Sequence, residues 1–350
     1  MSKSPFRPLN MSIQIFRRGL YSRRQPSRKM EQPYDYNRKW TLTPKFEANP
    51  HPRIKLLSYN ILAQDLLMEH LFLYVNIKQQ WLTWQQRLQS LHREIHKLDP
   101  DILCLQEMQY DHLPMLVQRL TASSGKRLEY VYKKKTGSRT DGCAIIYDAC
   151  KLQLLAQQGV ELYDANVPLL NRENVALLAK FRLKSTSQTK VLKEPKEVIV
   201  ATTHLLYNPK RHDVRCAQVN KLLSELRSFA IDADAKQPDE SYPTPVILTG
   251  DFNSEIHAPP MELLTTIAVD DPALNFESLD FGEYTASTFQ DKWITVDYIL
   301  HSVCPQNKQK LQVLSIYRLP TINCCSNVGC IPNHYLGSDH YALGAIFALT

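Results

Sequence analysis

Short runs of apolar, often β-branched residues recur along the chain from residue 54 to the C-terminus. Their length and composition are typical of buried strands. Strands are predicted at 54–59, 102–105, 130–132, 143–147, 152–155, 176–183, 197–203, 245–249, 294–300, 311–317 and 342–349. Residues 1–50 are polar, contain prolines and are weakly periodic, so ordered structure is expected to begin near Ile54.

Between these runs, three stretches have the period of amphipathic helices. Helices are predicted at 79–98, 111–123 and 213–230, and a polar, Pro-rich loop at 232–245. Asp99-Pro100 should end the first helix, because the residue before a proline avoids the helical conformation. The apolar side chains of that helix recur every three or four positions and form one buried stripe: Trp81, Trp84, Leu88, Leu91, Ile95 and Leu98.

Strands outnumber helices and occur in groups with helices between them. This arrangement favours a layered α/β or α+β sandwich over a strict βαβ array, within one domain that covers residues 51–350. The pattern alone does not determine the number of sheets.

The composition is that of an ordinary soluble globular protein, with 350 residues of which 43% are hydrophobic and 22% charged. No run approaches the roughly 18 consecutive apolar residues of a membrane-spanning helix, so no membrane segment and no membrane partner are expected. Of the eight cysteines, only Cys324, Cys325 and Cys330 are clustered, without the paired C-x2-C spacing of a structural zinc site. Reduced thiols are therefore expected.

The net charge of +7 comes from the N-terminal tail. Residues 1–30 hold eight basic and no acidic side chains, which leaves 34 basic and 35 acidic residues in the rest of the chain. A body this close to neutral favours contact with a few nucleotides over the wrapping of a long nucleic acid.

The tail, residues 1–50, is expected to be a disordered basic segment or a targeting segment. Its first 30 residues are rich in Arg and free of acids, like a mitochondrial presequence. The alternative is a basic arm that binds RNA or a nuclear import factor. The expected location is cytoplasmic or mitochondrial, and a nuclear location stays open.

Side chains suited to metal and phosphate chemistry stand at or near one end of six strand-like runs. Each could be an ordinary cap, turn or surface residue, and the Asp-x-Asn pair at 251–253 could form an Asx turn. Six such runs in this order predict that a sheet brings these side chains to one rim. They are Asn60, Glu107, His204, Asp251 with Asn253, Asp297, and Asp339 with His340.

Hydrolysis of a phosphodiester needs an oriented water and neutralisation of charge on the phosphate. Glu107 suits a magnesium ion that is held by one or two protein carboxylates, and Asn60 could support a metal-bound water. Asp251 and Asn253 lie two apart, so in extended backbone they would point the same way, the acid toward a water and the amide toward phosphate.

An acid–imidazole arrangement would complete such a site. Asp297 and the pair Asp339-His340 supply its groups, because a carboxylate holds an imidazole in one tautomer and raises its basicity. His204 offers a second imidazole at the end of a predicted strand.

The order of these motifs resembles that of the exonuclease–endonuclease–phosphatase superfamily, which includes deoxyribonuclease I and abasic-site endonucleases. The motifs are LSYN at 57–60, LQE at 105–107, THL at 203–205, GDFN at 250–253, VDYI at 296–299 and SDH at 338–340. Longer stretches resemble the deadenylase and nocturnin branch, most of all the angel proteins: LSYNILAQ at 57–64, DGCA at 141–144, THLLYNP at 203–209 and YTASTF at 284–289. The resemblance covers residues 54–350.

The resemblance implies a four-layer αββα sandwich, in which two packed mixed β-sheets are flanked by helices as in deoxyribonuclease I. It implies Mg²⁺-dependent hydrolysis of phosphodiester bonds at RNA 3′ ends, with Mn²⁺ as an alternative ion, by a 3′–5′ exoribonuclease of deadenylase type. An RNA 2′,3′-cyclic phosphatase that uses the same site is an alternative. A phosphatase of small nucleotides or lipid head groups and a non-catalytic RNA-binding adaptor are further alternatives.

Roles follow from the resemblance by motif. The resemblance assigns Glu107 and Asn60 to the metal, Asp251 to the water, Asn253 and His204 to the scissile phosphate, Asp297 to the positioning of His340, Asp339 to the metal side, and Asn208, Pro209 and Phe289 to substrate binding.

The chain also departs from the deadenylases. Docking through an upstream leucine-rich repeat domain is not expected, because only a tail precedes the catalytic body. Tyr207-Asn208-Pro209 stands where deadenylases tend to have Trp-Asp-Pro, and either Phe289 or Trp293 could be the aromatic that stacks on a base. These differences leave a preference for poly(A) open. The runs Lys133–Lys135 and Lys210–Arg211 could bind RNA phosphates or lie in solvated turns.

Overall fold

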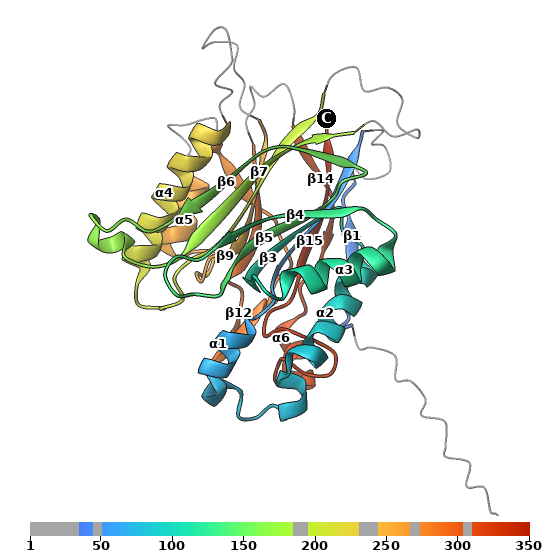
Figure 1. The fold of residues 1–350 in the computed structure, drawn as a ribbon, viewed down its shortest axis with the longest axis vertical. Helices are drawn as coiled ribbons and strands as arrows, with labels where there is room; N and C mark the ends of the chain where they lie inside the picture. Colours follow the sequence, from blue (N-terminus) through green and yellow to red (C-terminus); the bar gives the residue numbers. More distant parts are fainter. Residues whose placement is uncertain (1–34, 45–50, 185–194, 231–243, 267–273, 304–309) are drawn as a thin grey trace, which may run out of the picture. The chain divides into compact units, whose positions relative to one another are not determined.

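The computed structural model describes residues 35–44, 51–184, 195–230, 244–266, 274–303 and 310–350 (Figure 1). The basic tail at 1–30 and most of the predicted loop at 232–245 lie outside the described residues. Tyr34–Thr350 form one compact unit.

Two large mixed sheets make up this unit. The first has the strand order β1-β14-β15-β2-β3-β5-β4 and consists of Trp40–Leu42 (β1), Arg53–Asn60 (β2), Ile102–Gln109 (β3), Leu128–Lys134 (β4), Asp141–Asp148 (β5), Leu311–Tyr317 (β14) and Leu343–Leu349 (β15). The second has the order β10-β13-β9-β8-β7-β6 and consists of Leu152–Glu161 (β6), Val175–Leu183 (β7), Glu197–His204 (β8), Val246–Asp251 (β9), Phe276–Ser278 (β10) and Asp297–Ser302 (β13). A separate hairpin pairs Thr288–Gln290 (β11) with Lys292–Ile294 (β12).

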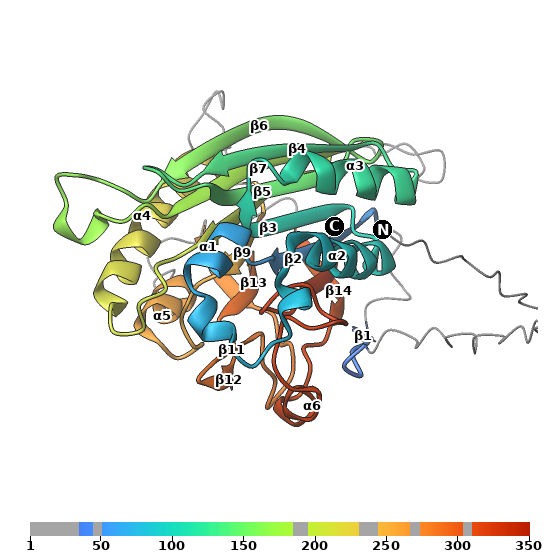
Figure 2. The same cartoon turned by 60° about the horizontal axis from the view of Figure 1, so that its bottom comes forward.

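Helices cover the outer faces of both sheets (Figure 2). Helices α2 and α3 lie on the first sheet, and α4 and α5 lie on the second. The helices are Gln64–Glu69 (α1), Trp84–Leu98 (α2), Leu113–Ser124 (α3), His212–Ala230 (α4), Pro259–Thr266 (α5) and Ile322–Val328 (α6), with short 3-10 helices at Leu71–Tyr74 (η1), Gln79–Leu82 (η2) and Pro168–Leu170 (η3). The predicted four-layer αββα sandwich is confirmed.

Continuous apolar runs produce this layering, because alternate residues of a strand face opposite sides of a sheet. In β3, Cys104 packs between the two sheets with Val200 of β8. Its neighbour Leu105 packs outward against Leu88 of α2. A strand that is buried on both faces therefore needs apolar residues at successive positions.

The structure corrects two boundaries and adds short elements that were not predicted. The predicted helix 79–98 is divided into η2 and α2, because Thr83 between them has an extended backbone and forms the N-cap of α2. Order also begins before Ile54, since β1 pairs with β14 along the edge of the first sheet. The short segments α1, α5, α6 and β10 were not predicted, because too few residues carry their pattern.

None of the helices in the described part of the chain has the length and apolar character needed to cross a membrane. The seven cysteines in the described ranges are free thiols.

Candidate active site

The ends of neighbouring strands bring the polar motifs to one rim. Strands β8 and β9 are parallel, so their last residues His204 and Asp251 lie side by side. Strand β13 runs antiparallel to β9, which places its first residue, Asp297, opposite Asp251. Strand β2 ends at Asn60 on the facing sheet, and its side-chain nitrogen donates to Asp251 Oδ2 at 3.0 Å. The predicted convergence of these groups is therefore observed.

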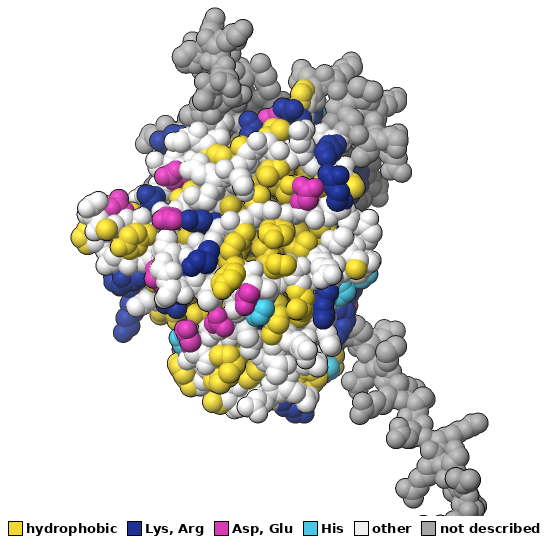
Figure 3. All heavy atoms as spheres, viewed as in Figure 1, with side chains coloured by type: hydrophobic (Ala, Val, Ile, Leu, Met, Phe, Trp, Pro, Cys, Tyr) yellow, Lys and Arg dark blue, Asp and Glu magenta, His cyan; other side chains and the backbone are white. Residues whose placement is uncertain are grey.

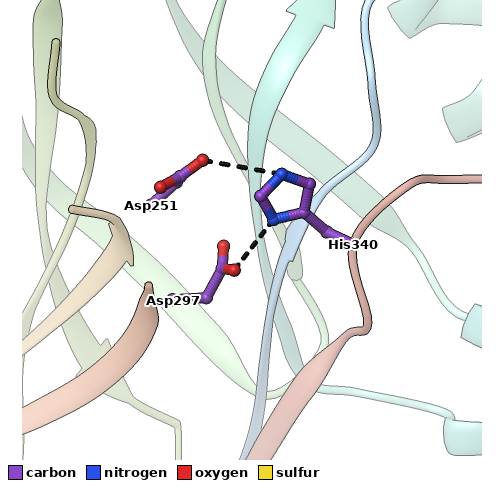
Figure 4. Close-up of side chains that lie close together, drawn as sticks. All are labelled: Asp251, Asp297 and His340. Carbon is purple, nitrogen blue, oxygen red and sulfur yellow. Dashed lines mark hydrogen bonds and ion pairs between the residues drawn. The ribbon is translucent and has the colours of Figure 1, made fainter. Parts of the chain in front are cut away.

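Three buried side chains form the centre of the site, with the His340 ring between two carboxylates (Figure 4). His340 Nδ1 lies 2.8 Å from Asp297 Oδ2, and His340 Nε2 lies 3.7 Å from Asp251 Oδ2. Ser338 donates to the carbonyl of Asn60 at 2.6 Å and thereby fixes the loop that carries the ring.

The charges of this group depend on each other. Burial alone would lower the pKa of His340, but the facing carboxylates, Asp297 above all, raise that pKa well above its usual value. Burial, and then the charge of Asp297, raises the pKa of Asp251 to about 7. The arrangement thus combines a cationic imidazole with a carboxyl group that can exchange a proton near neutral pH.

Glu107 stands at an irregular end of β3. Its φ of 56° is left-handed, and the β3–β5 pairing shifts register between Leu105 and Met108 at this point. The bulge turns the Glu107 carboxylate toward the end of the neighbouring strand β2, where Oε1 accepts from Asn60 at 3.1 Å and Oε2 from the backbone of Ala63 at 2.9 Å. Its side chain is 12% exposed.

A second carboxylate acts on Glu107. Burial, and then the negative charge of Asp339, raises the pKa of Glu107. Asp339 Oδ2 accepts a hydrogen bond of 2.7 Å from the hydroxyl of Tyr74, a residue that the sequence did not single out. Asp339 therefore lies close enough to Glu107 for its charge to act on that carboxylate.

His204 is the neutral imidazole of the site. Burial lowers the pKa of His204 well below its usual value, and the charge of Lys135 adds to that effect. Its ring lies with Nδ1 3.9 Å from Glu107 Oε1 and Nε2 3.7 Å from Asp251 Oδ2. Nδ1 is buried and has no hydrogen-bond partner in the described ranges, so it is available to a ligand.

Two groups of residues could hold a divalent cation. Asp251, Asp297 and His340 have donor atoms within 4.8 Å of one another. Asp297 and His340 are already bonded to each other, however, and a protonated imidazole cannot ligate a metal. Glu107 and Asp339 fit better, because the negative charge of Asp339 raises the pKa of Glu107, and a cation bound between the two carboxylates would relieve this repulsion.

The GDFN motif forms a tight turn. Gly250 has φ of 151°, and a Cβ there would lie 2.1 Å from the carbonyl oxygen of Thr203, so only glycine fits. Asn253 has a left-handed φ of 48°, and its backbone nitrogen donates to Asp251 Oδ1 at 2.9 Å. The expectation of extended geometry from Asp251 to Asn253 is wrong, since the aspartate caps an Asx turn. The Asn253 amide donates to Leu205 O at 3.0 Å and keeps one further hydrogen for a ligand.

The predicted substrate-binding residues lie at the surface. Asn208 and Pro209 are exposed on the loop after β8. Phe289 is 48% exposed on β11, and its ring packs edge-on against Trp293 at 5.1 Å. Thr288, next to Phe289, forms a bridge with His340, so this exposed ring borders the site.

Two fully buried arginines hold loops of the site, and sequence reasoning missed both. Arg87 donates to the carbonyl of Leu62 at 2.9 and 2.6 Å and to that of Gly337 at 3.2 Å. Arg215 donates to the carbonyls of Leu206 and Asn208 at 3.1 and 2.5 Å, respectively. A basic residue beside the apolar stripe of a helix was the signal for Arg87.

Basic side chains are scattered among acidic ones on the face drawn in Figure 3, and they form no continuous basic surface there. Arg211 of the predicted basic run at 210–211 is paired with Asp213 at 2.9 Å. Hydrophobic side chains gather over β4 and α3 on the same face.

Comparisons of sequence support the motif assignment. The profile of the Endonuclease/Exonuclease/phosphatase family matches residues 57–340. Protein angel of Drosophila melanogaster is 55% identical over 338 residues, which cover 93% of this chain and 91% of that protein. Protein angel homolog 2 of Bos taurus is 37% identical over 228 residues, which cover 65% of this chain but only 39% of that protein.

Comparisons with solved structures agree with the sequence comparisons. The crystal structure of ANGEL2, a 2′,3′-cyclic phosphatase, in complex with adenosine-2′,3′-vanadate matches with a TM-score of 0.73 and 27% identity, over 89% of this chain and 98% of that chain. The human Nocturnin catalytic domain with bound sulfate matches with a TM-score of 0.64 and 23% identity, over 91% of this chain and 100% of that chain. The second likeness shows the fold alone.

Proposed function

Because the chain belongs to the endonuclease/exonuclease/phosphatase family, we propose that it is a divalent-metal-dependent hydrolase of phosphodiester bonds at RNA 3′ ends. The observation that carries the proposal is the buried Asp297–His340–Asp251 arrangement beside the carboxylate of Glu107. A cationic hydrogen-bond donor and a proton acceptor this close together suit the binding and hydrolysis of a phosphate ester.

The reaction that we favour is the opening of a terminal 2′,3′-cyclic phosphate. The similarity to ANGEL2, a 2′,3′-cyclic phosphatase, supports this choice over the other reactions. The second candidate is a 3′–5′ exoribonuclease of deadenylase type. It is favoured by the exposed ring of Phe289 next to the site, on which the base of a terminal nucleotide could stack.

The proposed ion is Mg²⁺, with Mn²⁺ as the alternative. Glu107 would hold it, with Asp339 on the same side and Asn60 orienting the Glu107 carboxylate. When bound, the ion would neutralise charge on the phosphate oxygens.

The side chains of the protein then have separate tasks. Asp251 accepts a proton from the attacking water, which is the role of a carboxyl group with a pKa of about 7. His340, kept cationic by Asp297, donates a hydrogen bond to a phosphate oxygen, and neutral His204 donates another. The water oxygen bonds to phosphorus and one ring P–O bond breaks. A proton is returned to the released ribose oxygen, so the products are a phosphomonoester and a free hydroxyl.

The test uses 5′-labelled RNA that ends in either a 3′-hydroxyl or a 2′,3′-cyclic phosphate, with Mg²⁺ or EDTA. A single mobility shift of the cyclic substrate without shortening supports ring opening, and a ladder of shortened products supports the exoribonuclease. Tight binding of both RNAs without turnover would instead indicate an RNA-binding adaptor. Turnover of free nucleotides but not of RNA would indicate a small-molecule phosphatase.

Two variants test the site itself. Glu107→Ala and Asp251→Ala should abolish either activity, and Glu129→Ala, on the exposed part of β4, should not. Full activity in both site variants would refute the assignment.

A further inference from the structure

The segment from His204 to Leu206 is held by side chains at the point where strand pairing ends. Strand β7 pairs with β8 only as far as Thr203. Beyond that point, the side-chain amide of Asn174 donates to the carbonyl of His204 at 2.9 Å, and the side-chain oxygen of Gln218 accepts from the backbone nitrogen of Leu206 at 3.0 Å. Two side-chain amides thus replace the bonds that a neighbouring strand would supply.

These two amides are also bonded to each other. Gln218 Nε2 donates to Asn174 Oδ1 at 2.9 Å. Gln218, on α4, is fully buried, and Asn174, directly before β7, is 8% exposed. A chain of three hydrogen bonds therefore runs from the N–H of Leu206 to the carbonyl of His204 and spans the residue between them.

The two backbone groups fix the orientation of both amides. The N–H of Leu206 requires an acceptor, so the oxygen of Gln218 faces it and the nitrogen of Gln218 faces Asn174. The oxygen of Asn174 then accepts, and its nitrogen is left to donate to the carbonyl of His204. A carboxylate or an apolar side chain at either position cannot complete this chain, because each amide has to accept at one end and donate at the other.

The residue between them, Leu205, is bonded to the GDFN turn. Its nitrogen donates to the carbonyl of Asp251 at 2.9 Å, and its carbonyl accepts from the amide of Asn253 at 3.0 Å. The segment is therefore fixed by two separate sets of bonds. Because the imidazole of His204 lies 3.7 Å from Asp251 Oδ2, a rotation of this backbone would move the ring relative to the carboxyl group.

We propose that Gln218 and Asn174 are positioning residues, which act through the backbone of His204 and fix the place of its imidazole against the phosphate. The assignment rests on the proposed function, in which His204 donates a hydrogen bond to a phosphate oxygen. A misplacement of about 1 Å at a reacting centre can cost about 100-fold in rate, so the amide chain should affect kcat more than KM.

The competing explanation is that the two amides only satisfy buried backbone groups and attach α4 to the second sheet. Both explanations predict a lower Tm when the chain is broken, because buried backbone groups then lose their partners. They differ in a protein that lacks the imidazole. If Gln218 acts through His204, its replacement cannot lower kcat further once that ring is gone. If its loss distorts the site in general, the two losses in kcat multiply.

The experiment uses the full chain with Gln218→Met, His204→Ala and the double variant that combines them, at a temperature at which every variant is folded. Leu222→Ala truncates another fully buried side chain of α4 and is the matched control for lost stability. With whichever of the two RNAs the parent turns over in Mg²⁺, Gln218→Met should lower kcat about 10- to 100-fold and change KM by less than about 3-fold. Leu222→Ala should keep its kcat, and the double variant should stay within about 3-fold of His204→Ala.

An NMR measurement that needs no turnover accompanies the kinetics. The ring signals of His204 should shift or broaden in Gln218→Met, while those of His301, a buried imidazole of β13, should not.

A normal kcat in Gln218→Met would overturn the proposal, and so would multiplied losses in the double variant or unchanged His204 signals. If Gln218→Met does not fold, Asn174→Leu, alone and combined with His204→Ala, decides by the same criteria. Failure of the proposed function is a separate result, in which the unsubstituted protein turns over neither RNA in Mg²⁺. The His204 signals then decide whether the amide chain positions the ring.

Discussion

His340 Nδ1 lies 2.8 Å from a carboxylate oxygen of Asp297, and both side chains are buried. The bond fixes the tautomer of the imidazole, directs Nε2 toward Asp251 and keeps the ring cationic. The charge of one residue is therefore set by another residue that is 43 positions away in sequence.

Asp297→Asn should remove this control with little change of shape. An amide cannot stabilise the imidazolium as a carboxylate does, so the pKa of His340 should fall and kcat should decrease by about 10²- to 10⁴-fold. Steady-state kinetics and an NMR titration of the His340 ring would measure both effects. Asp148→Asn, at a buried carboxylate of β5 outside the site, is the matched control and should keep its kcat. An unchanged His340 titration in Asp297→Asn would contradict the mechanism.

Glu107→Gln should raise the Mg²⁺ requirement. The amide removes the charge, while its oxygen can still accept a hydrogen bond from Asn60 or Ala63. We expect the Mg²⁺ concentration for half-maximal activity to rise by at least about 10-fold, and a parallel rise with Mn²⁺. Titration of activity with each ion is the measurement. An unaltered Mg²⁺ requirement would indicate that the ion binds at the Asp251–Asp297–His340 group instead.

Asp251→Asn should stabilise the metal-free protein at high pH. The Asp251 carboxyl has a pKa of about 7 in the folded protein and near 4 in an unfolded chain, so folding takes up a proton between these values. Its contribution to stability is complete below about pH 4 and is lost as the pH rises through about 7. In EDTA at pH 8, Asp251→Asn should therefore melt on the order of 2 °C or more above the parent protein.

The pH series supplies the control for this prediction. The difference in Tm should shrink as the pH falls toward 4, because the parent carboxyl is then protonated and resembles the amide. A difference that is constant across the series would show that hydrogen bonding, and not ionisation, separates the two proteins.

Arg87→Met should weaken both the fold and the site. The guanidinium binds carbonyl groups of Leu62 and Gly337, which belong to the segments that follow Asn60 and precede Asp339. Leaving these buried acceptors without a donor should reduce the free energy of unfolding by on the order of 3 kcal/mol. Chemical denaturation measures this loss, and Arg93→Met, on the exposed face of the same helix, should show almost none.

The sequence was sufficient to predict a helix or strand where the pattern of apolar residues spans several positions. The run Ile102–Leu105 predicted a strand that is apolar on both faces, and the structure packs it between helices and the second sheet. Strands of three residues, such as β1 and β11, were missed because so few positions cannot establish a period.

The residues of the candidate site were predictable because each stands near a strand end within a recognisable motif, and parallel register brings such ends together. The supporting groups were not. Arg87 and Tyr74 act through bonds to distant segments, and the one local signal, the position of Arg87 beside the apolar stripe of its helix, does not identify those partners. The Asx turn at Asp251 was only an alternative in the sequence analysis, because the same two residues also fit an extended strand end.

Phe289→Ala should raise KM for RNA while leaving kcat nearly unchanged. The ring is 48% exposed, is held edge-on by Trp293 and stands next to the residue that bridges to His340, so a terminal base can reach it. Loss of one stacking partner of about 1–3 kcal/mol corresponds to a rise in KM of about 5- to 150-fold. Tyr284→Ala removes an aromatic ring that is 83% exposed and is the matched control, with KM expected to stay the same. A second substrate with an abasic terminal nucleotide sharpens the test, because Phe289→Ala should not change its KM. A fall in kcat on both substrates would mean that the ring supports the fold of the site and does not bind a base.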